Sequence, residues 1–195
     1  MNIKGRYKVK EIFGPTLQGE GHLIGTPCAF LRFADCNLSC SFCDTDFAGG
    51  EYMSGNEILA ALNKYKGKVE WLVITGGEPL MQLNRLLIDA LHTDGWKINV
   101  ETNGMFRLDR PVDHISFCPK VEPHKIRLDF CDSLKILWPD PKDLLIKFMD
   151  FPATHRFIQP IEDGHGFNKS VVDVLYEMRG EWRLSPQLHK LIGVK

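Results

Sequence analysis

The sequence predicts an α/β protein folded as a partial, open β/α barrel that is reduced in helices. Short apolar runs with strand character alternate with stretches of helical spacing, and this alternation favours parallel strands joined by crossover helices. The chain has 195 residues, which is short of the roughly 250 residues of a complete eight-fold barrel. We therefore expect one domain over residues 1–195, with functional groups at the carboxyl ends of the strands.

The expected elements follow in order along the chain. A strand is expected at 28–33, where aromatic and aliphatic residues follow a proline. Residues from about 34 to 50 hold three cysteines and a Gly-Gly pair, and we expect a loop there. Ser54 begins a capping-box pattern with Glu57, which predicts a helix that ends near Lys64.

The rest of the chain continues the same alternation. Further strands are expected where short apolar runs lie between turn residues, at 71–75, 97–101, 114–117, 134–137, 156–159 and 182–184. Helices are expected where apolar residues recur at helical spacing or a proline opens a turn, at 83–91, 141–147 and 171–178. These elements place the loop at 34–50 and two polar strand ends on one rim of the barrel.

Composition excludes several classes of protein. A net charge of -1, from 24 basic and 25 acidic residues, argues against a protein that coats nucleic acid by charge. No stretch approaches the roughly 18–20 apolar residues of a membrane span, and Met1 to Lys10 lacks the apolar run of a signal peptide. Six cysteines are too few for a disulfide scaffold. We therefore expect a cytoplasmic protein with reduced thiols.

Cys36, Cys40 and Cys43 form a C-x3-C-x2-C pattern inside the expected loop. Three thiolates this close together can all bind one inorganic group. An electron-transfer cluster uses four cysteines, so three would leave one iron of a [4Fe-4S] cluster open for chemistry. The alternative is a zinc site, but zinc prefers four ligands and paired C-x2-C spacings, and the candidate fourth ligand, Cys28, lies in an expected strand.

The cysteine spacing resembles that of the radical S-adenosylmethionine (SAM) superfamily. Gly76-Gly77-Glu78-Pro79, directly after the strand at 71–75, resembles the glycine-rich motif that holds the SAM amino group there. Phe42 stands where an aromatic residue beside the adenine is common. Glu101 to Gly104 resembles the polar strand end near the SAM ribose, although a helix cap or turn explains it equally well. The resemblance implies a partial barrel of the radical SAM type, in which SAM binds the open iron and yields a 5′-deoxyadenosyl radical.

The segment before the cysteines narrows the resemblance. Thr16 to Gly21 sets polar side chains around two glycines, with Gln18 able to donate and accept and Glu20 able to accept paired N–H donors. Arg32 lies in a mostly apolar strand and suits a substrate carboxylate, although a surface ion pair is the alternative. Together with the cysteine and glycine motifs, these residues make the chain resemble the 7-carboxy-7-deazaguanine synthase family over nearly its whole length.

That resemblance implies a reaction and its cofactors. The family is a lyase family that converts 6-carboxy-5,6,7,8-tetrahydropterin to 7-carboxy-7-deazaguanine by radical ring contraction with loss of ammonia, a step of 7-deazapurine and queuosine biosynthesis. The implied cofactors are a [4Fe-4S] cluster, SAM and Mg2+. An electron donor such as flavodoxin and a homodimer are the implied partners, with neither nucleic acid nor a membrane.

The resemblance also assigns residues. It implies that Cys36, Cys40 and Cys43 ligate the cluster and that Thr45 ligates Mg2+. The positions matched to SAM contacts are Phe42, Cys43, Asp44, Gly76, Gly77, Glu78, Glu101, Asn103, Cys118, Pro119, Lys120, Gln159, Pro160, Ile161 and Glu162. The positions matched to substrate contacts are Leu17, Gln18, Gly19, Glu20, Arg32, Thr75, His189 and Lys195. Cys118 replaces the serine expected before Pro-Lys, and the tail from about 185 to 195 is expected to close over the substrate.

Two other functions fit part of the pattern. One is another small radical SAM enzyme, such as an activase that makes a glycyl radical on a partner protein. Such an enzyme needs a docking surface more than a pterin pocket, and the polar segment at Thr16 to Gly21 favours the small molecule. The other is a zinc-stabilised binding module without activity, which would be colourless rather than brown.

Overall fold

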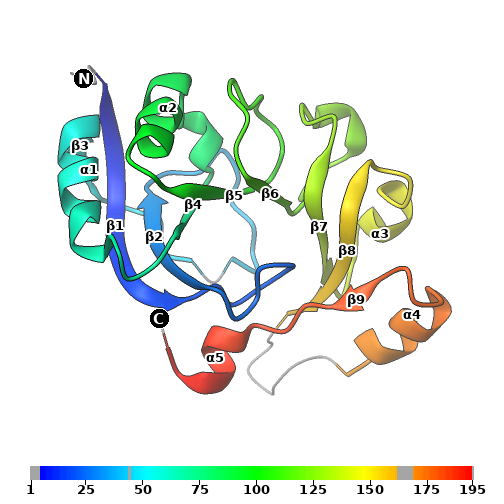
Figure 1. Ribbon diagram of the computed structural model, residues 1–195. Coiled ribbons are helices and arrows are strands. Elements are labelled where there is room, and N and C mark those ends of the chain that lie inside the picture. The colour runs from blue at the N-terminus through cyan, green and yellow to red at the C-terminus, as the bar shows by residue number, and fades with distance from the viewer. Residues whose placement is uncertain (1–4, 44, 162–168, 195) are drawn as a thin grey trace.

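The computed structural model describes residues 5–43, 45–161 and 169–194. Asp44, Glu162 and Lys195, to which the sequence assigns contacts, lie outside the described residues. The strands are β1 (Arg6–Leu17), β2 (Pro27–Phe33), β3 (Glu51–Ser54), β4 (Trp71–Gly76), β5 (Lys97–Thr102), β6 (His114–Phe117), β7 (Cys131–Trp138), β8 (Ala153–Pro160) and β9 (Arg183–Leu184). In this part of the chain they form one nine-stranded sheet in the order β3-β1-β2-β4-β5-β6-β7-β8-β9, which curves into an open barrel (Figure 1).

Most of the sheet is parallel, as the sequence predicts. Parallel pairing runs without a break from β2 through β4, β5, β6, β7 and β8 to β9. The first strand differs from the expectation, because β1 pairs antiparallel with both β2 and β3. Neither β1 nor β3 is apparent in the apolar pattern. Irregularities in register between Val9 and Glu11 and between Phe13 and Thr16 break the alternation of β1.

The first four helices lie outside the sheet, whereas the last lies at one end of it, beside the segment that follows β1 (Figure 1). The helices are α1 (Gly55–Leu62), α2 (Arg85–Thr93), α3 (Leu144–Lys147), α4 (Val171–Glu177) and α5 (Leu188–Ile192), with short 3-10 turns at Asn63–Tyr65, Pro79–Met81 and Pro123–Lys125. The capping box is present, because Ser54 Oγ accepts from the Glu57 N–H and Glu57 accepts from the Ser54 N–H. No helix in the described ranges is long and apolar enough to cross a membrane.

Two helix predictions need correction. The helix expected from Pro141 begins only at Leu144, because Asp143 before it adopts a left-handed conformation with φ 54°. The last helix, α5, has no sequence counterpart in the expected elements. Its five residues are too few for a clear helical period.

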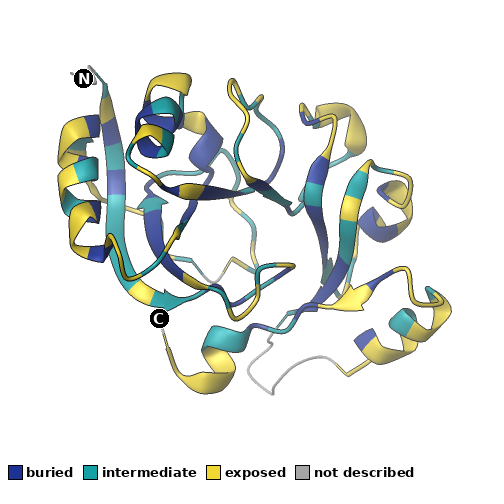
Figure 2. Cartoon of the chain, viewed as in Figure 1, coloured by how far each residue is buried: buried dark blue, intermediate teal, exposed yellow. Residues whose placement is uncertain are grey.

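Strand alternation divides the buried side chains between two faces of the sheet, and the exposed residues gather on the helices and loops around it (Figure 2). Leu31 and Phe33 of β2 face outward and pack with residues of α1 and α2, including Ile58 and Leu87. A second outer cluster joins β6, β7 and β8 to α3 and α4. Cys28 and Phe30 of β2 form a small inner cluster with Val73 of β4. Polar residues that share this inner face lie nearer the carboxyl ends of the strands, where a cavity opens.

Candidate active site

A single cavity collects most of the residues that the sequence singles out. It encloses about 1090 Å³, open solvent at its mouth included, and its walls come from the carboxyl ends of β4, β5, β7 and β8 and from the loop that holds the three cysteines. The sequence-predicted residues that line it are Glu20, Cys36, Cys40, Phe42, Cys43, Thr45, Thr75, Gly76, Gly77, Glu101, Asn103, Cys118, Lys120, Gln159, Pro160 and Ile161.

The cysteine loop is fixed against the glycine motif by close backbone contacts. The Gly77 N–H donates to the Phe33 carbonyl at 3.3 Å, and the Glu78 N–H donates to the Asp35 carbonyl at 3.1 Å. A Cβ on Gly77 would lie 2.0 Å from the Asp35 oxygen and 2.8 Å from the Cβ of Cys36. Only glycine permits this approach. The motif therefore positions the first cysteine.

Cys36, Cys40 and Cys43 are free thiols that share one stretch of the cavity lining. A turn joins the last two, because the Cys43 N–H donates to the Cys40 carbonyl at 3.1 Å. Thiolate-only donors suit an iron–sulfur cluster. Cys28, the candidate fourth zinc ligand, is fully buried in the inner apolar cluster and does not line the cavity. The residues thus fit a three-thiolate cluster better than a four-ligand zinc ion.

Glu78 has a different position from the one expected. Its side chain is fully buried and does not line the cavity. The carboxylate accepts hydrogen bonds from the Leu80 N–H at 2.9 Å, the Thr102 hydroxyl at 2.7 Å and the Asn103 N–H at 2.7 Å. Burial raises its pKa, against the effect of these donors. The structure therefore uses Glu78 to join the ends of β4 and β5, and its carboxylate does not face the cavity.

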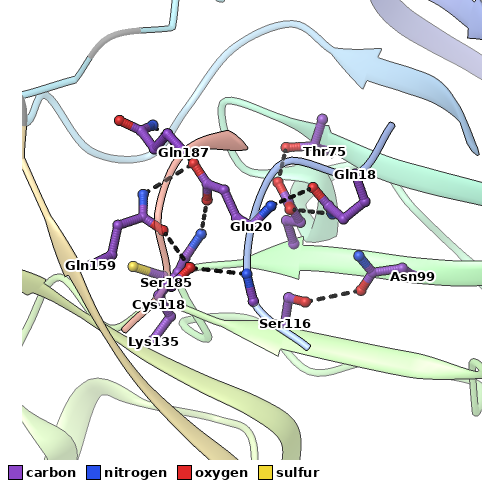
Figure 3. A network of polar contacts seen from close by, with 12 residues as sticks. Gln18, Glu20, Thr75, Asn99, Ser116, Cys118, Lys135, Gln159, Ser185 and Gln187 are labelled. Atoms are coloured by element: carbon purple, nitrogen blue, oxygen red, sulfur yellow. Dashed lines mark hydrogen bonds and ion pairs between the residues drawn. The ribbon is translucent and has the colours of Figure 1, made fainter. Parts of the chain in front are cut away.

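Glu20 is the centre of a buried polar network (Figure 3). Its carboxylate forms an ion pair with Lys135 and accepts hydrogen bonds from the side-chain amides of Gln159 at 3.0 Å and Gln187 at 2.9 Å. Burial is the largest effect and alone would raise the pKa of Glu20, but the charge and hydrogen bond of Lys135, the Gln187 hydrogen bond and the charge of His189 together outweigh it, and the pKa is lowered. The site therefore holds a charged carboxylate among amide donors.

Glu101 forms a second acceptor on the inner face. It accepts hydrogen bonds from the Gln18 amide at 2.9 Å and from the Thr75 hydroxyl at 3.1 Å. Gln18 is buried and does not line the cavity, so it supports Glu101 instead of facing the open space.

The C-terminal segment completes this side of the cavity. The Leu188 N–H donates to the Gly19 carbonyl at 2.9 Å, and the Gly21 N–H donates to the Ser185 hydroxyl at 2.9 Å. The ring of His189 lies against Gly19, where an added Cβ would be 1.9 Å from the ring Nδ1. Ser185, Leu188 and His189 therefore contact the glycines on both sides of Glu20.

Comparison with known proteins agrees with this geometry. The radical SAM superfamily matches residues 31–117. The chain is 39% identical to the 7-carboxy-7-deazaguanine synthase of Bacteroides thetaiotaomicron, over 96% of this chain and 98% of that protein. It is 36% identical to the enzyme of the same name from Nitratidesulfovibrio vulgaris, over 96% and 99%. The chain belongs to the 7-carboxy-7-deazaguanine synthase family.

The fold agrees with a solved structure as well. QueE from Escherichia coli superposes with a TM-score of 0.76 at 24% identity, covering 94% of this chain and 95% of that one. The partial α/β barrel with few helices, predicted from the sequence, is thereby confirmed.

Some residues that the family resemblance singles out do not line the cavity. They are Leu17, Gln18, Gly19, Arg32, Glu78, Pro119 and His189. Arg32 is on the inner face of β2, where its Nε donates to Glu11 at 3.0 Å and its guanidinium lies 5.9 Å from the Phe13 ring centroid. Its register partner, Thr75, does line the cavity.

Among the residues that the family resemblance assigns to SAM, Lys120 contacts both Cys118 and Phe42. Its ammonium lies 3.0 Å from the Cys118 sulfur and 5.3 Å from the Phe42 ring centroid. A cysteine is therefore accommodated where the family resemblance leads one to expect serine, with its sulfur accepting from the neighbouring lysine.

Sequence reasoning missed several residues of the cavity wall. They are Leu38, Phe47, Thr102, Ser116, Lys135, Leu137, Gln187 and Lys190. Lys135 could have been predicted from the sequence, because it is a charged residue within an apolar strand, as Arg32 is. Gln187 could not have been predicted, since nothing in its local sequence indicates that it reaches Glu20.

Proposed function

We propose that this chain is a carbon–nitrogen lyase that converts 6-carboxy-5,6,7,8-tetrahydropterin to 7-carboxy-7-deazaguanine by radical ring contraction with loss of ammonia. The observation that carries this proposal is the cavity, whose wall includes both the three cysteines and the Glu20 network. A radical formed beside the cysteines is then formed in the same enclosed space as a small polar substrate. The relatives that bear this enzyme's name support it over almost the whole chain.

Cys36, Cys40 and Cys43 hold the [4Fe-4S] cluster in this proposal. When bound, the cluster and SAM together supply the 5′-deoxyadenosyl radical that takes a hydrogen atom from the substrate. Gly76 and Gly77 leave room for SAM beside the backbone, since both line the cavity. Glu78 acts indirectly by fixing the backbone of Asn103. The further SAM contacts proposed are Phe42, Asp44, Glu101, Asn103, Cys118, Pro119, Lys120, Gln159, Pro160, Ile161 and Glu162.

The substrate lies on the side of the cavity formed by Glu20 and Thr75. Glu20 accepts N–H donors of the pterin, and Arg32 binds the substrate carboxylate through guanidinium N–H groups. Gln18 acts through Glu101, whose carboxylate it orients. Leu17, Gly19, His189 and Lys195 complete the proposed substrate contacts, with the C-terminal segment from 185 closing over them.

The proposal also includes a metal ion, an electron donor, the oligomeric state and the number of domains. Thr45 lines the cavity beside Cys43 and offers oxygen donors, which Mg2+ prefers. A low-potential donor such as flavodoxin supplies electrons to the cluster. The chain acts as a homodimer and as a single domain.

The test is anaerobic reconstitution followed by turnover. We expect a brown protein with about four irons per chain that cleaves SAM when reduced and releases ammonia and 7-carboxy-7-deazaguanine from the pterin. Cys40→Ala should lose the iron and SAM cleavage, whereas Cys131→Ala, a buried cysteine of the outer core, should keep both. A protein that cleaves SAM but leaves the pterin unchanged would contradict the proposed substrate. An active cluster in Cys40→Ala would contradict the ligand assignment.

A further inference from the structure

Lys135 is a buried cation that the family resemblance does not assign. It stands in β7 between Leu134 and Ile136, which pack in the outer core with α3 and α4. Strand alternation therefore turns Lys135 to the inner face, where it lines the cavity. Only 10% of its side chain is exposed. A charge this buried is costly unless it is paired.

The partner of Lys135 is Glu20. The Lys135 ammonium contacts Oε2 of Glu20, while the amides of Gln159 and Gln187 both donate to Oε1. Figure 3 shows these three donors converging on one carboxylate from β7, β8 and the segment before α5. A carboxylate has about four lone-pair sites, so three donors fix its orientation and leave room for a ligand N–H.

The charges around Glu20 favour its ionised form. Lys135 faces it from β7 and His189 from α5, and both lower its pKa against the effect of burial. Glu101 and Cys118 face Lys135 in turn, and the pKa of that lysine is raised by these groups and by Glu20, although burial opposes them. Without Lys135, the strongest cation facing Glu20 is gone, and the Gln187 hydrogen bond and the charge of His189 are left to oppose burial.

Resting on the proposed function, we propose that Lys135 is a positioning residue that holds the Glu20 carboxylate charged and oriented for the 2-amino-4-oxopyrimidine edge of the pterin. That edge presents an amino N–H and a ring N–H side by side, and a carboxylate accepts such a pair together. Oε2 keeps one acceptor site beside Lys135, so the paired N–H groups of the substrate need only one further site, and one of the two neutral amides on Oε1, Gln159 or Gln187, gives way. Lys135 stays in place and keeps the acceptor charged.

The first experiment compares Lys135→Met and Lys135→Arg with the parent enzyme. Lys97→Met is the matched control, because Lys97 is a lysine of β5 in an exposed ion pair with Glu70. For Lys135→Met we expect the KM for the pterin to rise roughly 10- to 100-fold, with kcat and substrate-free SAM cleavage changed far less. Lys135→Arg should restore most of the affinity, and Lys97→Met should match the parent.

The dependence of KM on pH distinguishes a Lys135 that keeps Glu20 charged from a Lys135 that only fills space. KM in Lys135→Met should rise as the pH is lowered across the range in which the parent is active, because Glu20 without its nearest cation takes up a proton more readily. The parent should show no such rise. If Lys135→Met keeps the parent KM and pH profile, the inference is wrong. If the parent itself leaves the pterin unchanged, it is the proposed function that fails.

A second pair of variants keeps the inference testable if Lys135→Met does not fold. The single variant Glu20→Gln is compared with the double variant Glu20→Gln/Lys135→Met. The double variant has lost both charges of the ion pair, so it leaves neither of them buried without its partner. If Lys135 acts through Glu20, the two variants should have the same KM within about twofold. A further large loss in the double variant would overturn the positioning role, since Lys135 would then act on the substrate itself.

Discussion

The backbone N–H of Asn103 donates to the buried carboxylate of Glu78 at 2.7 Å. This contact joins the polar end of β5 to the glycine motif after β4, and the Thr102 hydroxyl donates to the same side chain. The carboxylate meets donors only, as far as the contacts of the described residues go. A neutral amide in its place would set an N–H against at least one of them.

Glu78→Gln should therefore destabilise the cluster-free protein by about 1–3 kcal/mol. Urea unfolding of the reduced protein, followed by circular dichroism, measures the change. Glu70→Gln is the control, because its carboxylate is exposed and pairs only at the surface, and its unfolding midpoint should match the parent. Equal midpoints for both variants would show that Glu78 does not join the two strand ends.

Gly77→Ala should prevent stable loading of iron. The new Cβ would lie 2.0 Å from the Asp35 carbonyl oxygen and would displace Cys36 from the cavity wall. Iron per chain and visible absorption after anaerobic reconstitution measure the effect. Gly67→Ala is the control, since it strains a backbone of φ 74° but has no atom within 4 Å of the new Cβ, and it should load iron fully. Full iron in Gly77→Ala would mean that the cysteine loop tolerates displacement.

Arg32→Ala should raise the KM for the pterin about tenfold or more, because a charge-assisted hydrogen bond contributes about 1.5–3 kcal/mol. Iron content and SAM cleavage should remain, since Arg32 is on β2 and outside the cysteine loop. Arg85→Ala, which removes an exposed ion pair with Asp89, is the control. An unchanged KM would remove Arg32 from the substrate site and leave it as the partner of Glu11.

The stability of the protein should fall as the pH falls below neutral, in part because of His114. Burial lowers the pKa of His114 to about 4, whereas an unfolded histidine titrates near its ordinary value of about 6.5. Between these values the unfolded state binds the extra proton, so the stability present above about pH 6.5 is lost on acidification, by on the order of 3 kcal/mol.

Urea unfolding across this range of pH measures the slope. His114→Gln should flatten it, while His124→Gln, at an exposed position, should leave it unchanged. An unchanged slope in His114→Gln would assign the acid sensitivity to other groups, such as His155, whose pKa is also lowered by burial.

The sequence predicted what depends on near neighbours. The strands at β2, β4 and β5 were found because their apolar runs are short and bounded by turn residues. The strand β1 was missed because one side of it is polar and its register shifts break the alternation. The start of α3 was placed too early because a proline alone does not determine whether Asp143 is helical.

The site shows the same division. The cysteines and the glycines are close in sequence or follow a strand, so their spacing indicates their meeting place. Glu20 and Lys135 are separated by 115 positions, and only the curvature of the sheet brings β7 to the segment after β1. That pairing, and the burial of Glu78 between the ends of β4 and β5, depend on tertiary geometry that no local pattern records.

The hydrogen bond from Gln187 to Glu20 spans 167 positions. A chain emerging from the ribosome can build the sheet progressively from its N-terminal strands, but Glu20 lacks this donor until Gln187 has left the tunnel. The cysteine loop, by contrast, is made early. Under the proposed function, the three cysteines that would hold the cluster are therefore synthesised long before the donors that complete the Glu20 network.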